Sequence, residues 1–183
     1  MKALFLGGAR SGKSALAARK AAESSGEVCC IVTAAVTDAE MAARIEAHRR
    51  ERPGHWRVRE APIALASALR EEACAGGVLL VDCLTLWASN CLWPPGGVPS
   101  SAAQAEIAAD IDGWRRERGE FIEALSSDPC SVILVSNEVG GGIVPASSAA
   151  RLFRDEQGRL NQAVAAACDQ VFLVTAGLAL RLK

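Results

Sequence analysis

The sequence predicts a single α/β domain, residues 1–183, in which helices flank a mostly parallel sheet. Short runs of consecutive apolar residues recur along the chain, as expected for strands that are buried on both faces of a parallel sheet. Longer amphipathic stretches separate these runs, and such alternation is typical of α/β proteins. The segment dense in proline, glycine and serine, residues 93–101, is interpreted as an exposed connection and not as a domain boundary.

The predicted elements follow in order along the chain. Five apolar runs are assigned to strands: 2–6, 28–33, 78–82, 131–136 and 170–175. The stretches between them are assigned to helices: 13–24, 38–51, 62–75, 101–126 and 147–166. The last piece, "GLALRLK" (177–183), begins with a glycine after the fifth strand, and we expect it to return as a short antiparallel edge strand.

Composition narrows the possible classes of protein. The chain has 20 Lys and Arg residues and 21 Asp and Glu residues, so its net charge is −1. The protein as a whole therefore does not attract a polyanion such as a nucleic acid, and any basic patch must act locally. No apolar run approaches the roughly 18 residues of a membrane span, and the N-terminal run is too short for a signal peptide, so we expect a cytoplasmic protein. The seven cysteines form no C-x-x-C pair, which argues against a disulfide framework or a zinc site.

A glycine-rich segment after the first strand carries the strongest motif. The residues "GGARSGKS" (7–14) match G-x-x-x-x-G-K-S, with Gly7, Gly12, Lys13 and Ser14 at the fixed positions. Glycines let successive N–H groups point at one phosphate, and the following helix N-terminus adds its dipole. Lys13 would neutralise the β and γ phosphates, and Ser14 would ligate Mg²⁺. A plain turn is the alternative, but the position between a strand and a helix favours the phosphate loop.

An acidic residue at the end of a buried strand is the expected partner of such a loop. The run "VLLVD" ends in Asp82, whose carboxylate would hold Mg²⁺ directly or through water. An acid in this position is often only a strand end or a cap. Its combination with the glycine-rich loop favours the metal-binding interpretation.

The predicted helix that leads into the basic stretch "HRRERPGHW" (48–56) carries His48, one of the two histidines of the chain. The helix is predicted to begin at Thr37, with Glu40 in capping-box spacing, and to end before Pro53. Its periodicity places His48 on the same face as Met41, which favours a packed core histidine. Nearby arginines favour another interpretation, because cationic groups keep an imidazole neutral and nucleophilic and attract phosphates. The residues alone leave the choice open.

Six blocks in order along the chain resemble a known family. They are "GGARSGKS", "DAEMAARIEAHRRERPGHW", "VDCLTLWASN", "SNEVGGGIVP", "ARLFRDEQGRLNQ" and "LVTAGL". The first block alone is generic, but the ordered set is similar to the bifunctional adenosylcobinamide kinase and adenosylcobinamide-phosphate guanylyltransferase family of cobalamin biosynthesis. The resemblance runs nearly end to end, and it implies a RecA-like P-loop fold and a homotrimer.

The resemblance also implies an activity and its partners. Members phosphorylate the aminopropanol hydroxyl of adenosylcobinamide with a nucleoside triphosphate, ATP or GTP. They then transfer GMP from GTP through a guanylylated histidine to adenosylcobinamide phosphate, giving adenosylcobinamide-GDP. The family histidine falls on His48 here, and His55 is its neighbour before Trp56. Relatives can carry glutamate in place of Asp82. The resemblance therefore leaves open whether the shorter side chain of Asp82 contacts Mg²⁺ directly or through water.

The residues implied by the resemblance are of two kinds. Mg²⁺ would be held by Ser14 and Asp82. Nucleotide contacts fall on the following residues: Gly7, Gly8, Ala9, Arg10, Ser11, Gly12, Lys13, Ser14, Val32, Thr33, Ala34, Arg49, Arg50, Glu51, Arg52, Glu60 and Asp82. The glycines 140–142 follow a strand, so their loop is expected at the ligand-binding edge of the sheet and could shape the cobinamide pocket; a plain turn is the alternative. The block "RDEQGRLNQ" is interpreted as a mostly solvated helix face.

Two other functions fit part of the sequence. A plain P-loop kinase would use the phosphate loop and Asp82 but would leave the basic stretch without a role. A RecA-like module could bind single-stranded nucleic acid through the arginines and Trp56. The near-neutral charge and the aromatic content of 4% argue against nucleic acid.

Overall fold

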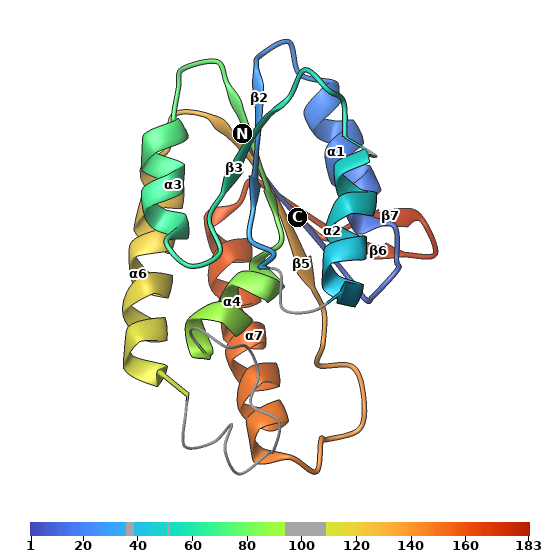
Figure 1. Ribbon diagram of the computed structural model, residues 1–183, viewed down its shortest axis with the longest axis vertical. Helices are drawn as coiled ribbons and strands as arrows, with labels where there is room; N and C mark the ends of the chain where they lie inside the picture. Colours follow the sequence, from blue (N-terminus) through green and yellow to red (C-terminus); the bar gives the residue numbers. More distant parts are fainter. Residues whose placement is uncertain (36–38, 51, 94–108) are drawn as a thin grey trace.

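The computed structural model describes residues 1–35, 39–50, 52–93 and 109–183. Its strands form one seven-stranded sheet in the order β3-β2-β4-β5-β1-β6-β7 (Figure 1). Their bounds are β1 (Lys2–Gly7), β2 (Val28–Val32), β3 (Arg57–Glu60), β4 (Val78–Asp82), β5 (Ser131–Asn137), β6 (Gln170–Thr175) and β7 (Leu178–Arg181). The five strands predicted from apolar runs are all confirmed.

Neighbouring strands run parallel throughout the sheet except at its C-terminal edge. There β7 pairs antiparallel with β6, with Thr175 opposite Leu178, and this confirms the predicted return strand. Strand β5 lies between β1 and β4. The carboxyl ends of these three strands therefore meet at one edge of the sheet, where ligands bind in α/β proteins.

The described helices cover both faces of the sheet (Figure 1). Their bounds are α1 (Lys13–Ala22), α2 (Ala39–Arg50), α3 (Leu65–Glu72), α4 (Leu84–Leu92), α6 (Ile111–Ser127) and α7 (Ser148–Ala167). One core lies beneath α1 and includes Trp56, whereas the other is formed with α3, α4, α6 and α7. Successive strand residues enter opposite cores, as Leu4 and Phe5 do, which explains why the strands are apolar on both faces.

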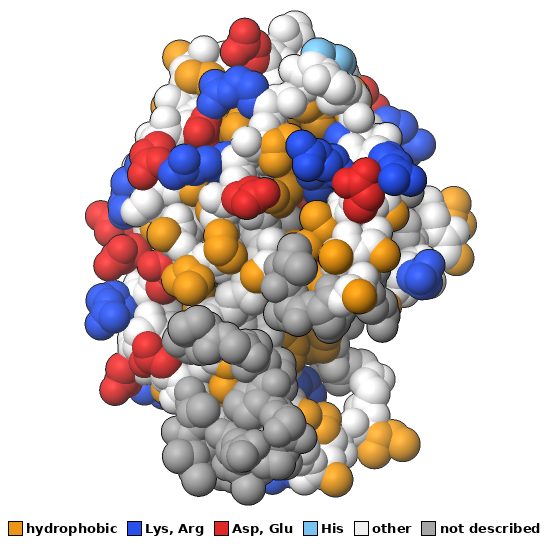
Figure 2. All heavy atoms as spheres, viewed as in Figure 1, with side chains coloured by type: hydrophobic (Ala, Val, Ile, Leu, Met, Phe, Trp, Pro, Cys, Tyr) orange, Lys and Arg blue, Asp and Glu red, His pale blue; other side chains and the backbone are white. Residues whose placement is uncertain are grey.

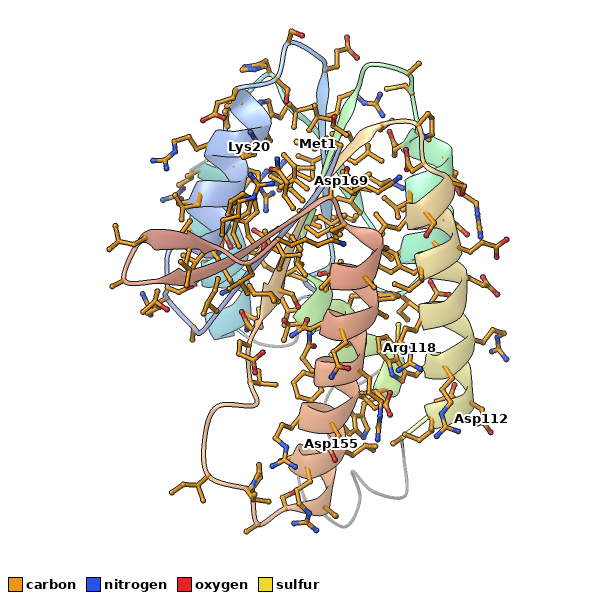
Figure 3. All side chains as sticks on the ribbon, turned by 180° about the vertical axis from the view of Figure 1, so that it is seen from behind. Met1, Lys20, Asp112, Arg118, Asp155 and Asp169 are labelled. Atoms are coloured by element: carbon orange, nitrogen blue, oxygen red, sulfur yellow. The ribbon has the colours of Figure 1, made fainter. Side chains whose placement is uncertain are left out.

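The larger core contains the bulkiest side chains. The ring of Trp87 on α4 lies 5.1 Å from the ring of Trp114 and 4.8 Å from that of Phe121, both on α6. Next to them the buried Glu156 on α7 accepts hydrogen bonds from Trp114 Nε1 at 2.8 Å and Arg118 Nη1 at 3.0 Å. Arg118 reaches from α6 to α7 in this way (Figure 3). This contact joins the two longest described helices on that face of the sheet.

Two elements were not predicted. Strand β3 reads "RVRE", and all four of its residues are exposed because it is an edge strand. Helix α4 reads "LTLWASNCL", and six of its residues are buried. Without an apolar run in β3 or a clear amphipathic period in α4, the usual patterns for a strand and a helix are missing.

Several predicted boundaries shift or lie outside the described residues. The helix predicted over 101–126 is described from Ile111, where the N-cap Asp110 accepts a hydrogen bond from Gly113 N at 2.9 Å. Trp93, at the start of the predicted exposed connection, is buried, and residues 94–101 are not described. The predicted capping residue Thr37 is also outside the described part of the chain.

The surface carries a mixture of charges. Figure 2 shows Lys and Arg side chains interspersed with Asp and Glu on the face in view, in keeping with the net charge of −1. Five of the seven cysteines are buried, whereas Cys74 is exposed and Cys83 is half-buried. Within the described residues, no helix is both long and apolar enough to cross a membrane.

Candidate functional site

The predicted phosphate loop joins β1 to α1 and has the backbone that its glycines allow. Gly12 caps α1 with a φ of 92°, and Arg10 also has a positive φ of 57°. Helix α1 has no acidic residue in its first turn, so its N-terminus can attract an anion. The side chain of Lys13 is folded into the loop, where Nζ donates a hydrogen bond to the carbonyl of Gly8 at 3.3 Å.

The turn between β6 and β7 supports this loop from the side. The backbone N–H of Gly177 donates to the carbonyl of Ser11 at 2.8 Å. A Cβ atom on Gly7 would lie 2.5 Å from the carbonyl oxygen of Val174, which explains why the first position of the loop is glycine. The loop is therefore fixed by the last strands of the sheet as well as by β1 and α1.

Asp82 ends β4 beside the loop, as predicted. The hydroxyl of Ser14 donates a hydrogen bond to Asp82 Oδ1 at 3.4 Å. Burial raises the pKa of the Asp82 carboxyl, whereas the charges of His48, Arg52 and Lys13 and the hydrogen bond from Ser14 lower it. Carboxylate and hydroxyl oxygens are ligands that Mg²⁺ prefers, so this pair fits the predicted metal.

His48 lies in the last turn of α2, and its side chain is exposed. The two apolar residues of the same face, Met41 and Ile45, are half-buried. His48 is therefore not the packed core histidine that helical periodicity favours. A positive charge on its imidazole would lower the pKa of the Asp82 carboxyl, as the charge of Lys13 does.

The basic residues after His48 lie in different surroundings. Arg49 and Arg50 are exposed, and Arg50 Nε donates to Glu46 Oε1 at 3.0 Å within the same helix. Arg52 is half-buried, and its charge lowers the pKa of Asp82 and that of the buried Cys30. The charge of Arg52 thus acts on an acid of the candidate site, whereas Glu51 lies outside the described residues.

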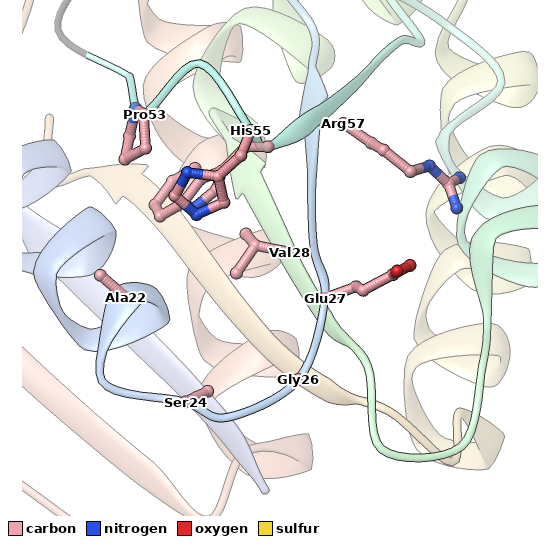
Figure 4. A pocket seen from close by; sticks show the side chains of 9 residues that line it. Ala22, Ser24, Gly26, Glu27, Val28, Pro53, His55 and Arg57 are labelled. Atoms are coloured by element: carbon pink, nitrogen blue, oxygen red, sulfur yellow. The ribbon is translucent and has the colours of Figure 1, made fainter.

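His55 and Trp56 lie away from the phosphate loop. His55 lines a hollow of about 370 Å³ together with Pro53 and the residues that precede β2, including Gly26 and Glu27 (Figure 4). This hollow is at the amino edge of β2, whereas the phosphate loop is at the carboxyl edge of the sheet. Trp56 is buried in the core beneath α1 and is not available to stack on a base.

The other predicted nucleotide contacts follow β2 and β3. Val32 and Thr33 are buried at the end of β2, and Thr33 Oγ1 donates to the carbonyl of Cys83 at 2.7 Å. Ala34 is half-buried just beyond them, and the exposed Glu60 ends β3 in register with Val32. These residues share one edge with Asp82, although Glu60 is two strands away from it.

A polar junction at the end of β5 was not predicted as part of the site. The N–H of Asn137 donates to Thr85 Oγ1 at 2.8 Å, and its carbonyl accepts from Asn161 Nδ2 at 3.0 Å. The next residue, Glu138, donates its N–H to the carbonyl of Gly7 at 3.1 Å. Asn161 is buried and is therefore an exception to the mostly solvated helix face expected for its block. The only signal in the sequence is the run of polar residues after a buried strand.

Fold and site together define a P-loop nucleotide-binding protein of the α/β class. A solved structure of a prototypical ATPase from the type III secretion system of pathogenic bacteria has a similar fold, with a TM-score of 0.51 and 12% sequence identity. The likeness covers 98% of this chain and 56% of the ATPase chain. At this identity the match shows the fold alone.

The particular family follows from the sequence. A family model described as cobinamide kinase / cobinamide phosphate guanyltransferase matches residues 3–182, and the chain belongs to this family. It is 48% identical over 183 residues to the bifunctional adenosylcobalamin biosynthesis protein CobP of Pseudomonas aeruginosa, covering 100% of this chain and 98% of the relative. It is 41% identical to the bifunctional protein CobU of Escherichia coli K12, with both chains covered completely. The chain is accordingly a bifunctional cobinamide kinase and guanylyltransferase of cobalamin biosynthesis.

Proposed function

We propose that the enzyme phosphorylates the aminopropanol hydroxyl of adenosylcobinamide with ATP or GTP. It then transfers GMP from GTP through a guanylyl-His48 intermediate to adenosylcobinamide phosphate, releasing pyrophosphate and giving adenosylcobinamide-GDP. One observation carries this proposal: Ser14 of the phosphate loop binds Asp82 Oδ1 at 3.4 Å, and His48, in the last turn of α2, contributes to the electrostatic surroundings of the same carboxyl. A candidate nucleophile and the phosphate loop are therefore linked through one acid.

The phosphate loop supplies the groups that hold the triphosphate. Its N–H groups and the α1 N-terminus bind phosphate oxygens, and Lys13 exchanges its bond to the Gly8 carbonyl for a bond to the nucleotide. Ser14 and Asp82 would hold Mg²⁺, which would supply charge neutralisation at the phosphates. Arg52, whose charge also lowers the pKa of Asp82, adds a second cationic group.

The guanylyl step uses the exposed imidazole. A neutral ring nitrogen of His48 attacks the α-phosphorus of GTP, the N–P bond forms, and the bond to pyrophosphate breaks. An oxygen of the substrate phosphate then attacks the same phosphorus, and the N–P bond breaks to release the histidine. Exposure of His48 supports this role because a nucleophile must reach its substrate.

Two further parts of the proposal concern the whole enzyme. We place it in the cytoplasm, and we expect a homotrimer. Leu178, Leu180 and Leu182 alternate along the C-terminal edge of the sheet and are 57–75% exposed, which is typical of a subunit contact. Sedimentation at several protein concentrations would measure the assembly, and a monomer throughout would contradict this part.

The proposal differs from its two rivals at particular residues. A plain kinase gives the exposed His48 no role, whereas the guanylyl step uses it as the nucleophile. A nucleic-acid-binding module would need Trp56 on the surface, whereas this side chain is buried. The guanylyltransferase reaction therefore accounts for more of the described site than either rival.

Labelling with GTP that carries the label at its α-phosphate tests the intermediate. Wild type and His55→Ala, the matched control, are expected to retain label after denaturation, and His48→Ala is expected to retain none. The linkage is expected to be labile in acid and stable in alkali, as a phosphoramidate is. His48→Ala should still phosphorylate adenosylcobinamide. Label on His48→Ala, or loss of label on His55→Ala alone, would move the nucleophile elsewhere.

A further inference from the structure

The end of β5 delivers a carboxylate between the two halves of the phosphate site. Strand β5 lies between β1, which leads into the phosphate loop, and β4, which ends in Asp82. The first residue after β5 is Glu138, and its N–H donates to the carbonyl of Gly7 at 3.1 Å. Glu138 is therefore attached directly to the start of the phosphate loop.

The backbone before Glu138 is held on both sides. The N–H of Asn137 is bound by Thr85 on α4, and its carbonyl is bound by Asn161 on α7. Asn161 Oδ1 in turn accepts from the buried Ser136 Oγ at 2.7 Å. A side chain that follows such an anchored strand end has a defined position, which is what a group in a reaction site requires.

The carboxylate itself is oriented but accessible. Glu138 Oε1 accepts a hydrogen bond from the N–H of Gly140 at 2.6 Å, and the residue is exposed. A Cβ on Gly141 or Gly142 would meet nothing within 4 Å, so the loop after Glu138 is open. A substrate hydroxyl can approach Glu138 from this side.

Two other carboxylates at this edge are less suitable for removing a proton from a substrate. Among the described residues, the ends of the parallel strands carry Glu60, Asp82 and Glu138. Asp82 is engaged by Ser14 and lies among cationic groups, which suits a metal ligand. Glu60 ends the edge strand β3, with β2, β4 and β5 between it and β1.

We propose that Glu138 is the general base of the kinase step, an inference that rests on the proposed function. As the substrate oxygen forms its bond to the γ-phosphorus, the bond from that phosphorus to the β-phosphate oxygen breaks, and the hydroxyl proton passes to the carboxylate of Glu138. The nucleoside diphosphate leaves. Guanylyl transfer needs no such base, because a neutral imidazole and an ionised phosphate are already nucleophiles.

The two reactions of one enzyme provide the test. Glu138→Gln keeps the size and the acceptor oxygen for Gly140 but cannot take a proton. We expect phosphorylation of adenosylcobinamide to fall by about 10²- to 10⁴-fold, the usual contribution of a general base. Guanylylation by α-labelled GTP, and transfer to adenosylcobinamide phosphate supplied ready-made, are expected to stay at the wild-type level. Glu123→Gln, an exposed residue of α6, is the matched control for both reactions.

The possible outcomes are distinct. An unchanged rate of phosphorylation in Glu138→Gln would overturn the proposal. So would an equal fall of both reactions, since that would make Glu138 a support of the phosphate loop. Glu138→Asp, which restores a carboxylate on a shorter side chain, is expected to recover part of the kinase rate, and a rate no higher than that of the Gln variant would contradict a proton-accepting role. A wild-type enzyme that labels His48 but never phosphorylates adenosylcobinamide would contradict the kinase part of the proposed function itself.

Discussion

Ser14 Oγ lies 3.4 Å from Asp82 Oδ1, across the space between the start of α1 and the end of β4. The hydroxyl belongs to the phosphate loop, which follows β1, and the carboxylate belongs to Asp82 at the end of β4. Strand β5 lies between β1 and β4. Under the proposed function, these two residues would hold Mg²⁺, which would neutralise charge on the phosphates of a bound nucleotide.

Replacing the carboxylate should therefore change the response to metal. Asp82→Asn keeps the shape of the side chain but removes its charge, and we expect the Mg²⁺ concentration needed for half-maximal kinase activity to rise at least about tenfold. Titration of activity with Mg²⁺ at saturating nucleotide measures this. Asp112→Asn, an exposed residue in the first turn of α6, is the control. An unchanged titration for Asp82→Asn would exclude it as a metal ligand.

Lys13→Ala is expected to weaken GTP binding by at least tenfold, or about 1.4 kcal/mol, because the phosphates lose a charged partner. Both reactions should slow together, since they share the loop. Equilibrium binding of GTP measures the effect. Lys20→Ala on the same helix is the control, because Lys20 pairs with Glu23 at 3.6 Å on the surface. Normal affinity in Lys13→Ala would refute a shared phosphate site.

The thiol of Cys30 should make the fold sensitive to alkali. Burial raises its pKa from 9.0 to about 12, so above pH 9 the unfolded chain releases a proton that the folded chain keeps. Stability is therefore lost progressively between pH 9 and about 12. Urea unfolding at a series of pH values is expected to show a shallower decline for Cys30→Ala than for wild type. Parallel declines would contradict the raised pKa.

Gly177→Ala should affect nucleotide binding as well as stability. Gly177 has a φ of 78°, and its N–H binds the carbonyl of Ser11 in the phosphate loop. We expect a loss of about 1 kcal/mol in unfolding free energy and weaker GTP binding. Gly76→Ala is a matched control, because Gly76 has a φ of 83° in the turn before β4. Gly76→Ala should lose similar stability while its affinity for GTP stays at the wild-type value. Equal GTP affinities for the two variants would contradict a link between the Gly177 turn and the phosphate loop.

The sequence predicts the parts of the site that depend on local patterns. The strand before Gly7 and the helix after Lys13 are recognisable because buried strands are apolar throughout and the loop has fixed spacing. The position of His48 was ambiguous, because periodicity identifies a helix face but not what covers it. The junction of Asn137 with Thr85 and Asn161 joins three segments far apart in the chain, and no local pattern encodes such a contact.

The bond between Gly177 and Ser11 joins two segments that are far apart in the order of synthesis. The phosphate loop is synthesised before its flanking strands β5 and β6 and before the supporting turn. Until these later segments emerge, a nascent chain carries the complete nucleotide motif without the neighbours that hold it in shape. Competence to bind nucleotide is therefore expected only after the β6–β7 hairpin has emerged.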